Sequence, residues 1–191
     1  MAVMDQLRWK DIIQGDRQAY SEMYTTFYRS FFNYGRKFTE DSDLIEDAIQ
    51  EVLMVAWTDR LKLEQIHSPR AYLFTAFRHA LFARLRRLSH FTANLPDEPD
   101  FPADHLILKK ETDLLRHEQL QAALRQLTSR QREAIFLRFY EGLSYEQTAE
   151  VMGISVKATY KLMARSLLQL RDILAISLTT LLAILRTRTG A

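Results

Sequence analysis

The chain has 191 residues, and 47% of them are hydrophobic, so it is long enough to bury one large or two small hydrophobic cores. A formal net charge of only +2 excludes a uniformly basic protein, so any binding to nucleic acid must depend on local patches. The absence of cysteine excludes disulfides, thiolate metal sites and a cysteine nucleophile, and it fits a cytoplasmic protein. Glycine (5) and proline (4) are scarce, which predicts an all-α fold.

Residues 5–40 are rich in aromatic side chains and predict helices. Gly15 and Asp16 supply a turn and an N-cap between them. The aromatic residues recur mostly at helical spacing, which is typical of a hydrophobic core rather than of a ligand site. Charged residues interrupt the N-terminus, where a secretion signal needs an apolar run, so no such signal is expected.

The next predicted helix, residues 43–60, has one apolar and one acidic face. Asp43, Glu46, Asp47 and Gln50 gather on the acidic side, with Glu51 at its edge. Paired carboxylates can serve acid–base catalysis, but nothing nearby supplies a pocket or a group that stabilises an electrophile. The acidic face is therefore either a docking surface for a basic partner or a plain solvated face, and this segment alone leaves both open.

A loop over residues 61–68 leads to a helix over residues 69–88, which Pro69 opens. The candidate nucleic-acid contacts in the second half of this helix are Arg78, His79, Arg84, Arg86 and Arg87. Basic residues supply affinity for phosphates, and the interleaved aromatic rings offer stacking surfaces for unpaired bases. A basic surface helix over an aromatic core is the alternative. No second histidine stands at a ligand spacing from His79, so no metal site is expected.

Residues 89–112 break the helical pattern. Three of the four prolines fall here, among several acidic residues, which predicts an extended, acidic linker. The linker separates a helical domain over residues 1–88 from a second one over residues 113–172. An apolar tail, residues 173–191, follows the second domain.

Residues 143–170 predict two helices joined by a tight turn, after two supporting helices of which the second is capped by Thr128. Ser144 is a suitable first N-cap, Gly153 ends the first helix in a left-handed conformation, and Ser155 caps the second helix. Basic residues recur along one side of the second helix: Lys157, Lys161 and Arg165. A small-to-apolar seam lies opposite them: Thr159, Met163, Ser166 and Leu170. The pattern predicts a helix-turn-helix whose second helix reads DNA, and a helical hairpin with a solvated lysine face is the alternative.

Three segments in order resemble the extracytoplasmic-function (ECF) members of the bacterial sigma-factor family. DLIEDAIQEVLMVAW (43–57) is similar to region 2.2, SPRAYLFTAFRHALFARLRRL (68–88) is similar to regions 2.3 and 2.4, and residues 127–171 are similar to region 4. The resemblance covers about residues 9–172. A lone helix-turn-helix would also fit a response regulator, but the ordered combination is specific.

The resemblance implies a subunit that brings core RNA polymerase to promoter DNA, with no active site, cofactor, metal or small-molecule substrate and with an anti-sigma factor as a further partner. The residues that would dock on the clamp coiled coil of the largest polymerase subunit are Asp43, Asp47, Gln50 and Glu51. The basic helix would contact the minus-ten element, the 61–68 loop would hold a flipped base, and the linker would thread towards the polymerase active site. The residues that would read the minus-thirty-five element in the major groove are Ser155, Val156, Lys157, Ala158, Tyr160, Lys161 and Arg165.

Four positions depart from the family pattern. His79 stands where asparagine is common and Ala83 where aspartate is common, so base preference at the minus-ten element is open. Thr148 and Thr159 replace usual aliphatic residues, and each hydroxyl is expected on a backbone carbonyl of the preceding turn. The alternative function is another helix-turn-helix regulator with an N-terminal helical sensor domain. An enzyme is not expected, because we find no glycine-rich phosphate loop, metal cluster or nucleophile–base pair.

The spacing of apolar residues in the reader helix continues through residues 173–185. This predicts that the reader helix runs on as one long amphipathic helix. The apolar stretch is shorter than the about 20 residues that a membrane-spanning helix needs. We expect it to fold back on the N-terminal domain. Docking on an anti-sigma factor or another chain is an alternative, and lying on a membrane surface is less favoured because its polar side carries only Ser and Thr.

Overall fold

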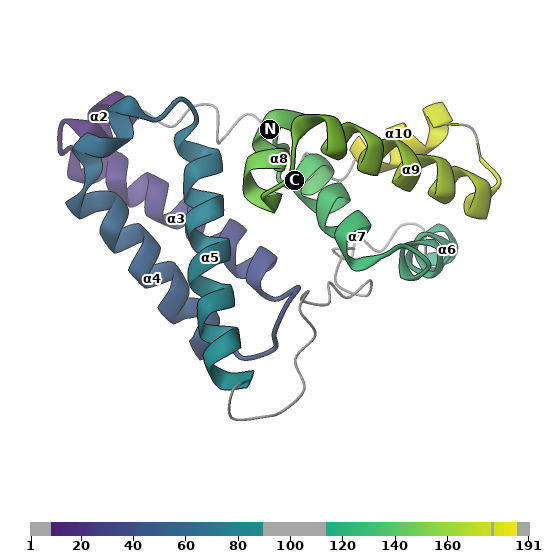
Figure 1. The fold of residues 1–191 in the computed structure, drawn as a ribbon, viewed down its shortest axis with the longest axis horizontal. Coiled ribbons are helices and arrows are strands. Elements are labelled where there is room, and N and C mark those ends of the chain that lie inside the picture. Colours follow the sequence, from purple (N-terminus) through teal and green to yellow (C-terminus); the bar gives the residue numbers. More distant parts are fainter. Residues whose placement is uncertain (1–8, 90–113, 177, 187–191) are drawn as a thin grey trace. The chain divides into compact units, whose positions relative to one another are not determined.

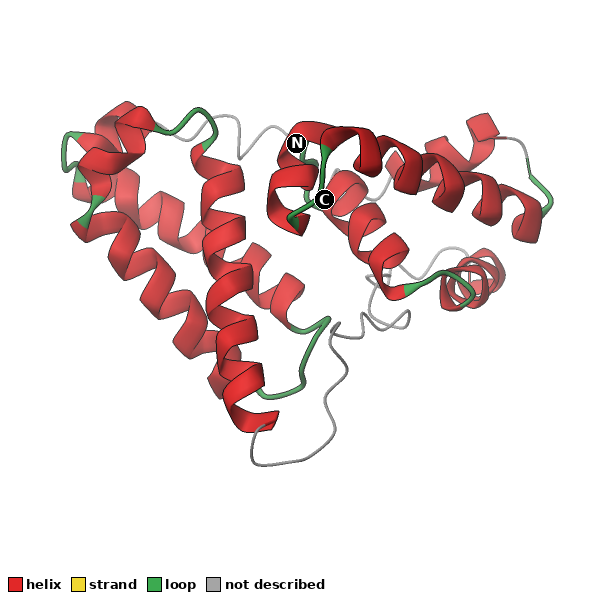
Figure 2. Ribbon diagram, viewed as in Figure 1, coloured by secondary structure: helices red, strands yellow, loops and turns green. Residues whose placement is uncertain are grey.

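In the computed structural model, the described residues are 9–89, 114–176 and 178–186, and every regular element among them is helical (Figure 2). The expected all-α fold is confirmed. The chain divides into two compact units, Met1–Glu98 and Pro99–Ala191. Almost all of the expected linker, residues 89–112, lies outside the described residues.

The described part of the first unit contains three long helices and two short ones. They are α2 (Trp9–Ile13), α3 (Arg17–Gly35), α4 (Ser42–Thr58), the 3-10 helix η1 (Arg60–Gln65) and α5 (Pro69–Ser89). Helices α3, α4 and α5 pack against one another, and α2 packs against η1 (Figure 1). The predicted caps are confirmed: the Asp16 carboxylate accepts from the Gln18 backbone N–H at 2.7 Å, and Pro69 is the first residue of α5.

Aromatic residues of α3 and α5 form the core of the first unit, as expected. Phe31 stacks on Phe77 with 4.6 Å between ring centroids, and Phe74 approaches Phe31 edge-on at 5.1 Å. All three are fully buried, and burial of each such side chain contributes about 2 kcal/mol. A Cβ at Gly35 would lie 2.8 Å from Cγ2 of Ile45, so glycine is what allows α3 to approach α4 this closely.

The second unit is built around one long helix, α9. Its described elements are α6 (Leu114–Arg125), α7 (Ser129–Ile135), the π-helix η3 (Phe136–Tyr140), α8 (Tyr145–Met152), α9 (Val156–Leu174) and α10 (Leu178–Arg186). Helices α6, α7, α8 and α10 all pack against α9. The second supporting helix continues from α7 into a π-helical turn, in which the Glu141 N–H donates to the Phe136 carbonyl at 3.1 Å.

The predicted helix-turn-helix is formed by α8 and α9. Ser144 Oγ accepts from the Gln147 N–H at 3.1 Å, and Ser155 Oγ accepts from the Ala158 N–H at 3.2 Å. Gly153 ends α8 with a left-handed backbone, φ 64°. The predicted seam of α9 is buried along its whole length: Thr159, Met163, Ser166 and Leu170. Local capping signals and the apolar seam therefore place both helices correctly.

The two core threonines of the helix-turn-helix behave differently. Thr159 Oγ1 donates to the Ser155 carbonyl at 3.2 Å, as expected. The Thr148 hydroxyl is buried and has no hydrogen-bond partner among the described residues, so the expectation is wrong for Thr148. A buried hydroxyl left without a partner costs about 1–3 kcal/mol, so Thr148 is a locally unfavourable residue in this core.

The C-terminal segment does not continue the reader helix as predicted. Helix α9 ends at Leu174, because Ala175 takes a left-handed backbone (φ 51°, ψ 36°) that an α-helix cannot pass through. Helix α10 then turns by 104° and packs on α9 and η3, where Leu181 and Leu185 are fully buried. The segment folds back, but the helices it covers belong to the second unit, whereas we expected the first.

No single helix in the described ranges is long and apolar enough to cross a membrane. Helix α9 and residues Thr179–Leu185 meet the criteria of length and composition only together, as a bent pair.

Candidate functional site

The four residues expected to bind polymerase lie on the solvent side of α4. Asp43, Asp47, Gln50 and Glu51 are all exposed, and their helical spacing places them along one side of the helix. Met54 follows one turn later and is 61% exposed. The acidic stripe therefore ends in an exposed apolar residue, a combination that suits a basic partner with an apolar anchor.

A groove between α4 and α5 borders this stripe. Most of its lining is apolar, including Val55 and Tyr72, which are 41% and 37% exposed. Glu51 and His79 also line it. Exposed apolar side chains beside a groove are typical of a surface that a partner covers.

The basic residues of α5 have different surroundings. His79, Arg86 and Arg87 are exposed, and the two arginines lie in the last turns of the helix. Arg78 is half-buried, with its guanidinium carbon 4.4 Å from the ring centroid of Phe82. Helix α5 thus presents its exposed arginines at its C-terminal end.

Arg84 is held by α4. Its Nη2 lies 2.6 Å from Glu51 Oε2 and donates to the Asp47 carbonyl at 3.4 Å. The Arg84 side chain is only 25% exposed. The structure therefore joins a residue expected to contact DNA to a residue expected to contact polymerase.

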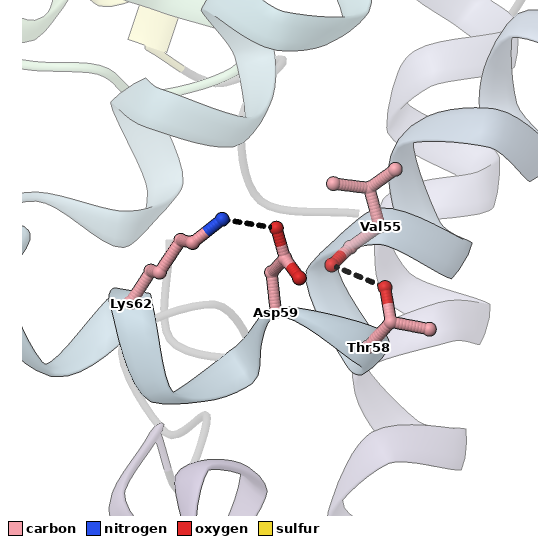
Figure 3. A network of polar contacts seen from close by, with 4 residues as sticks. All are labelled: Val55, Thr58, Asp59 and Lys62. Carbon is pink, nitrogen blue, oxygen red and sulfur yellow. Dashed lines mark hydrogen bonds and ion pairs between the residues drawn. The ribbon is translucent and has the colours of Figure 1, made fainter.

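The segment expected to be a loop over residues 61–68 is partly helical, because its first residues belong to η1. Leu61 is 67% exposed at the start of this segment. Lys62 Nζ lies 2.5 Å from Asp59 Oδ2 (Figure 3), and this hydrogen bond raises the pKa of Lys62 by favouring the charged ammonium. A short 3-10 turn thus presents an exposed leucine.

The predicted reader residues line the exposed side of α9. The exposed ones are Ser155, Val156, Lys157, Tyr160, Lys161 and Arg165, and Ala158 is half-buried. Within the part of the chain that the structure describes, Lys157, Lys161 and Arg165 have no ion-pair partner. The Ser155 hydroxyl oxygen is occupied by its capping hydrogen bond. The lysines are therefore available to an anionic partner.

Among the described residues, no group of three or more His, Asp or Glu side chains is placed to hold a metal ion.

Comparison with known proteins decides between the two candidate functions, a sigma factor and another helix-turn-helix regulator. Residues 23–91 match the family model described as "Sigma-70 region 2", and residues 117–170 match "Sigma-70, region 4". The chain is 24% identical over 163 residues to the RNA polymerase sigma factor YlaC of Bacillus subtilis, covering 81% of this chain and 91% of the relative. It is 25% identical over 145 residues to the ECF RNA polymerase sigma factor SigX of the same species, covering 72% and 74%.

The chain belongs to the ECF-type RNA polymerase sigma factors. Its function is to direct transcription initiation, and it is not an enzyme. The alternative of a regulator with an N-terminal sensor domain is excluded, because the N-terminal helices match sigma region 2.

A solved structure shows the same fold. The sigma factor RpoE of Bartonella quintana, in complex with the anti-sigma factor NepR, aligns with a TM-score of 0.57 at 22% identity. The alignment covers 82% of this sigma factor and 97% of that chain.

Sequence reasoning missed how η1 is held in this sigma factor. The Arg60 guanidinium carbon lies 5.0 Å from the Trp57 ring centroid, and its Nη1 donates to the Trp57 carbonyl at 3.3 Å. A Cβ added at Gly15 would lie 3.4 Å from the Arg60 guanidinium nitrogens, so the arginine sits between the indole and the Gly15 turn. No signal in the sequence connects Gly15 to Arg60.

Sequence reasoning also did not predict a side-chain cluster of Arg138, Tyr145 and Tyr160 in the helix-turn-helix. The rings of Tyr145 and Tyr160 stack with centroids 4.2 Å apart and planes inclined by 22°. The Arg138 guanidinium carbon lies 5.0 Å from the Tyr145 centroid, and Arg138 Nη1 donates to the Leu143 carbonyl at 2.8 Å. The cluster links η3, α8 and the first turns of the reader helix.

Glu146 completes this cluster. Its carboxylate accepts from the Ser144 hydroxyl at 2.8 Å. Hydrogen bonding to its own backbone, and then to Ser144, lowers the pKa of Glu146 because it favours the ionised form. The carboxylate is therefore ionised at neutral pH.

Proposed function

We propose that this sigma factor docks on core polymerase through Asp43, Asp47, Gln50 and Glu51 of α4, contacts the minus-ten element through α5 and reads the minus-thirty-five element through α9. One observation carries the proposal: exposed carboxylates line α4, whereas exposed lysines line α9 opposite its buried seam. Carboxylates repel DNA phosphates and attract a basic protein surface, and lysines do the reverse. Each face therefore suits one kind of partner.

At the minus-ten element, α5 and η1 act together. Arg86 and Arg87 supply phosphate contacts at the end of α5, and Leu61 stands exposed in the segment that holds the flipped base. Extruding a base costs a few kcal/mol, and the phosphate contacts offset that cost.

The groove between α4 and α5 supports an anti-sigma factor as a further partner. The RpoE relative of the same fold was crystallised with its anti-sigma factor. Here Val55 and Tyr72 leave apolar surface exposed beside the acidic stripe, and a regulator that covers it would also block polymerase. Both binding events take place in the cytoplasm.

Run-off transcription with purified core polymerase tests the proposal. With this chain added, the polymerase should start at specific promoters on fragments of the host genome. If no specific transcript appears and the chain does not bind core polymerase, the proposal fails.

A charge-reversal variant isolates the docking face. Asp43→Lys combined with Asp47→Lys should weaken binding to core polymerase about tenfold, because two attractive contacts become repulsive. Glu22→Lys, an exposed acidic residue on α3, is the matched control and should bind core polymerase like the unaltered chain. Equal affinity of the α4 variant and the control would show that α4 is not the docking face.

A further inference from the structure

Tyr160 differs from the other exposed side chains on the reading side of α9. It is 49% exposed and lies one turn after Lys157. One face of its ring stacks on Tyr145 at 4.2 Å. An aromatic ring with two rotatable side-chain bonds that is already stacked loses little conformational freedom when it binds.

Tyr145 is itself held from outside the helix-turn-helix. Arg138 of η3 lies over its ring at 5.0 Å and is anchored to the Leu143 carbonyl at 2.8 Å. Such a cation–π contact contributes about as much as an ordinary hydrogen bond at a partly exposed site. The direction of the Tyr160 ring is therefore determined by a chain of contacts that begins in η3.

The hydroxyl of Tyr160 faces the helix-turn-helix rather than a free solvent pocket, because it contributes, after the Glu146 backbone and Ser144, to lowering the pKa of the Glu146 carboxylate, which accepts from the Ser144 hydroxyl at 2.8 Å. The ring itself is the part of Tyr160 whose position is fixed by a stacking contact. What Tyr160 offers to the major groove is the carbon surface of its ring.

We propose that Tyr160 recognises thymine through its 5-methyl group, by apolar contact with the ring, and that Tyr145 is the positioning residue that holds the ring for this contact. The inference rests on the proposed role of α9 in reading the minus-thirty-five element. In the major groove, the thymine methyl is the one apolar group that distinguishes a base, and it is the natural partner for a rigid carbon surface.

Replacement of thymine by deoxyuridine tests this directly, because it removes only the methyl group. The probe is a promoter duplex selected from a random pool by the holoenzyme, in which each thymine of the upstream element is replaced in turn. One replacement should lower affinity about fourfold, the effect of one buried carbon group. Tyr160→Ala should bind the thymine and uracil duplexes equally at that position.

Two further variants separate positioning from folding. Tyr145→Ala should reduce the thymine-to-uracil ratio towards one, whereas Tyr145→Phe should keep it, because stacking needs no hydroxyl. Tyr160→Phe should also keep the ratio, because the proposed contact with the methyl group is made by the ring carbons and not by the hydroxyl. A purely structural effect would lower affinity for both duplexes and leave their ratio unchanged, and Arg125→Ala, an exposed residue on α6, controls for this.

The outcomes are distinct. Failure of the proposed function would appear as no selection of an upstream element by the holoenzyme. With an element selected, three results would overturn the inference. They are no loss of affinity on any uracil replacement, an unchanged thymine-to-uracil affinity ratio in Tyr160→Ala, and loss of that ratio in Tyr160→Phe.

Discussion

The two helices proposed to contact DNA use their basic residues differently. On α5, Arg84 is paired with Glu51 of the neighbouring helix and Arg78 lies over Phe82. On α9, Lys157 and Lys161 have no ion-pair partner within the described residues. Helix α9 can therefore bind phosphates without giving up contacts of its own, whereas Arg84 must leave α4 before it can do so. Among the residues proposed to contact DNA, Arg84 therefore differs from Lys157 and Lys161 in having to exchange one partner for another.

The largest expected effect comes from removing the lysines of α9. Lys157→Ala with Lys161→Ala should lower the affinity of the holoenzyme for promoter DNA by more than about tenfold, because two phosphate contacts are lost. The slope of log affinity against log salt should become shallower by about 1.8. Filter binding or fluorescence anisotropy at several salt concentrations measures both, with Arg125→Ala as the control. If the slope of log affinity against log salt did not change, the lysines of α9 would not contact phosphates, and the difference from Arg84 of α5 would not hold.

A smaller effect tests the exchange on α5. Arg84→Ala should raise affinity for core polymerase about twofold to fivefold, because a basic partner no longer competes with Arg84 for Glu51. The range is limited because exposed ion pairs contribute at most about 1 kcal/mol. Titration of labelled chain with core polymerase measures it, and Arg29→Ala, an exposed arginine on α3, is the control. Unchanged or weaker binding would mean that Arg84 only braces α4 against α5.

Thr148 of α8 and Thr159 of α9 lie in the buried core of the helix-turn-helix. Changing them tests whether the stability of this core can be altered without changing DNA binding by the lysines of α9. Thr148→Val should raise the free energy of unfolding by about 1 kcal/mol, since it removes a buried hydroxyl that has no described partner. Thr159→Val should lower it by a similar amount, since it breaks the bond to the Ser155 carbonyl. Denaturation followed by circular dichroism compares them. Effects of the same sign would contradict the account, and neither variant should change the salt slope of promoter binding.

The smallest expected effect concerns the turn after α9. Ala175→Gly should raise the free energy of unfolding by about 0.5 kcal/mol. Relief of the left-handed strain, about 1 kcal/mol, is partly offset by the greater freedom of glycine in the unfolded chain. Thermal unfolding measures the change, and a destabilised variant would argue against the 104° turn between α9 and α10.

Local signals explain what could be predicted from the sequence. Ser144, Gly153 and Ser155 act on backbone groups within a few residues, so their effect does not depend on the rest of the fold. The buried seam of α9 follows from helical spacing alone. The exposed stripe of α4 follows from the same spacing, and Asp43, Asp47 and Glu51 lie on it as expected. Glu46 does not, because it is half-buried and accepts from the Tyr28 hydroxyl at 3.0 Å.

Contacts between helices could not be predicted, because they depend on how the helices cross. Arg84 meets Glu51, Arg60 meets the Gly15 turn, and Tyr160 meets Tyr145 only after the helices have packed. The break at Ala175 is a further case. Neither glycine nor proline marks it, and the apolar spacing continues through it. After the break, Leu181 and Leu185 of α10 are buried where α10 packs on α9 and η3, a contact between helices that spacing alone does not reveal.

Cleavage of promoter DNA from two defined positions tests the central claim that α5 and α9 contact different promoter elements. Because the chain has no cysteine, Lys161→Cys and Arg87→Cys each create a single attachment point for an iron chelate that cuts nearby DNA. In the holoenzyme bound to a promoter, the reagent at position 161 should cut at the minus-thirty-five element and the reagent at position 87 should cut at the minus-ten element. Cleavage of the same element from both positions, or the reverse pattern, would contradict the account.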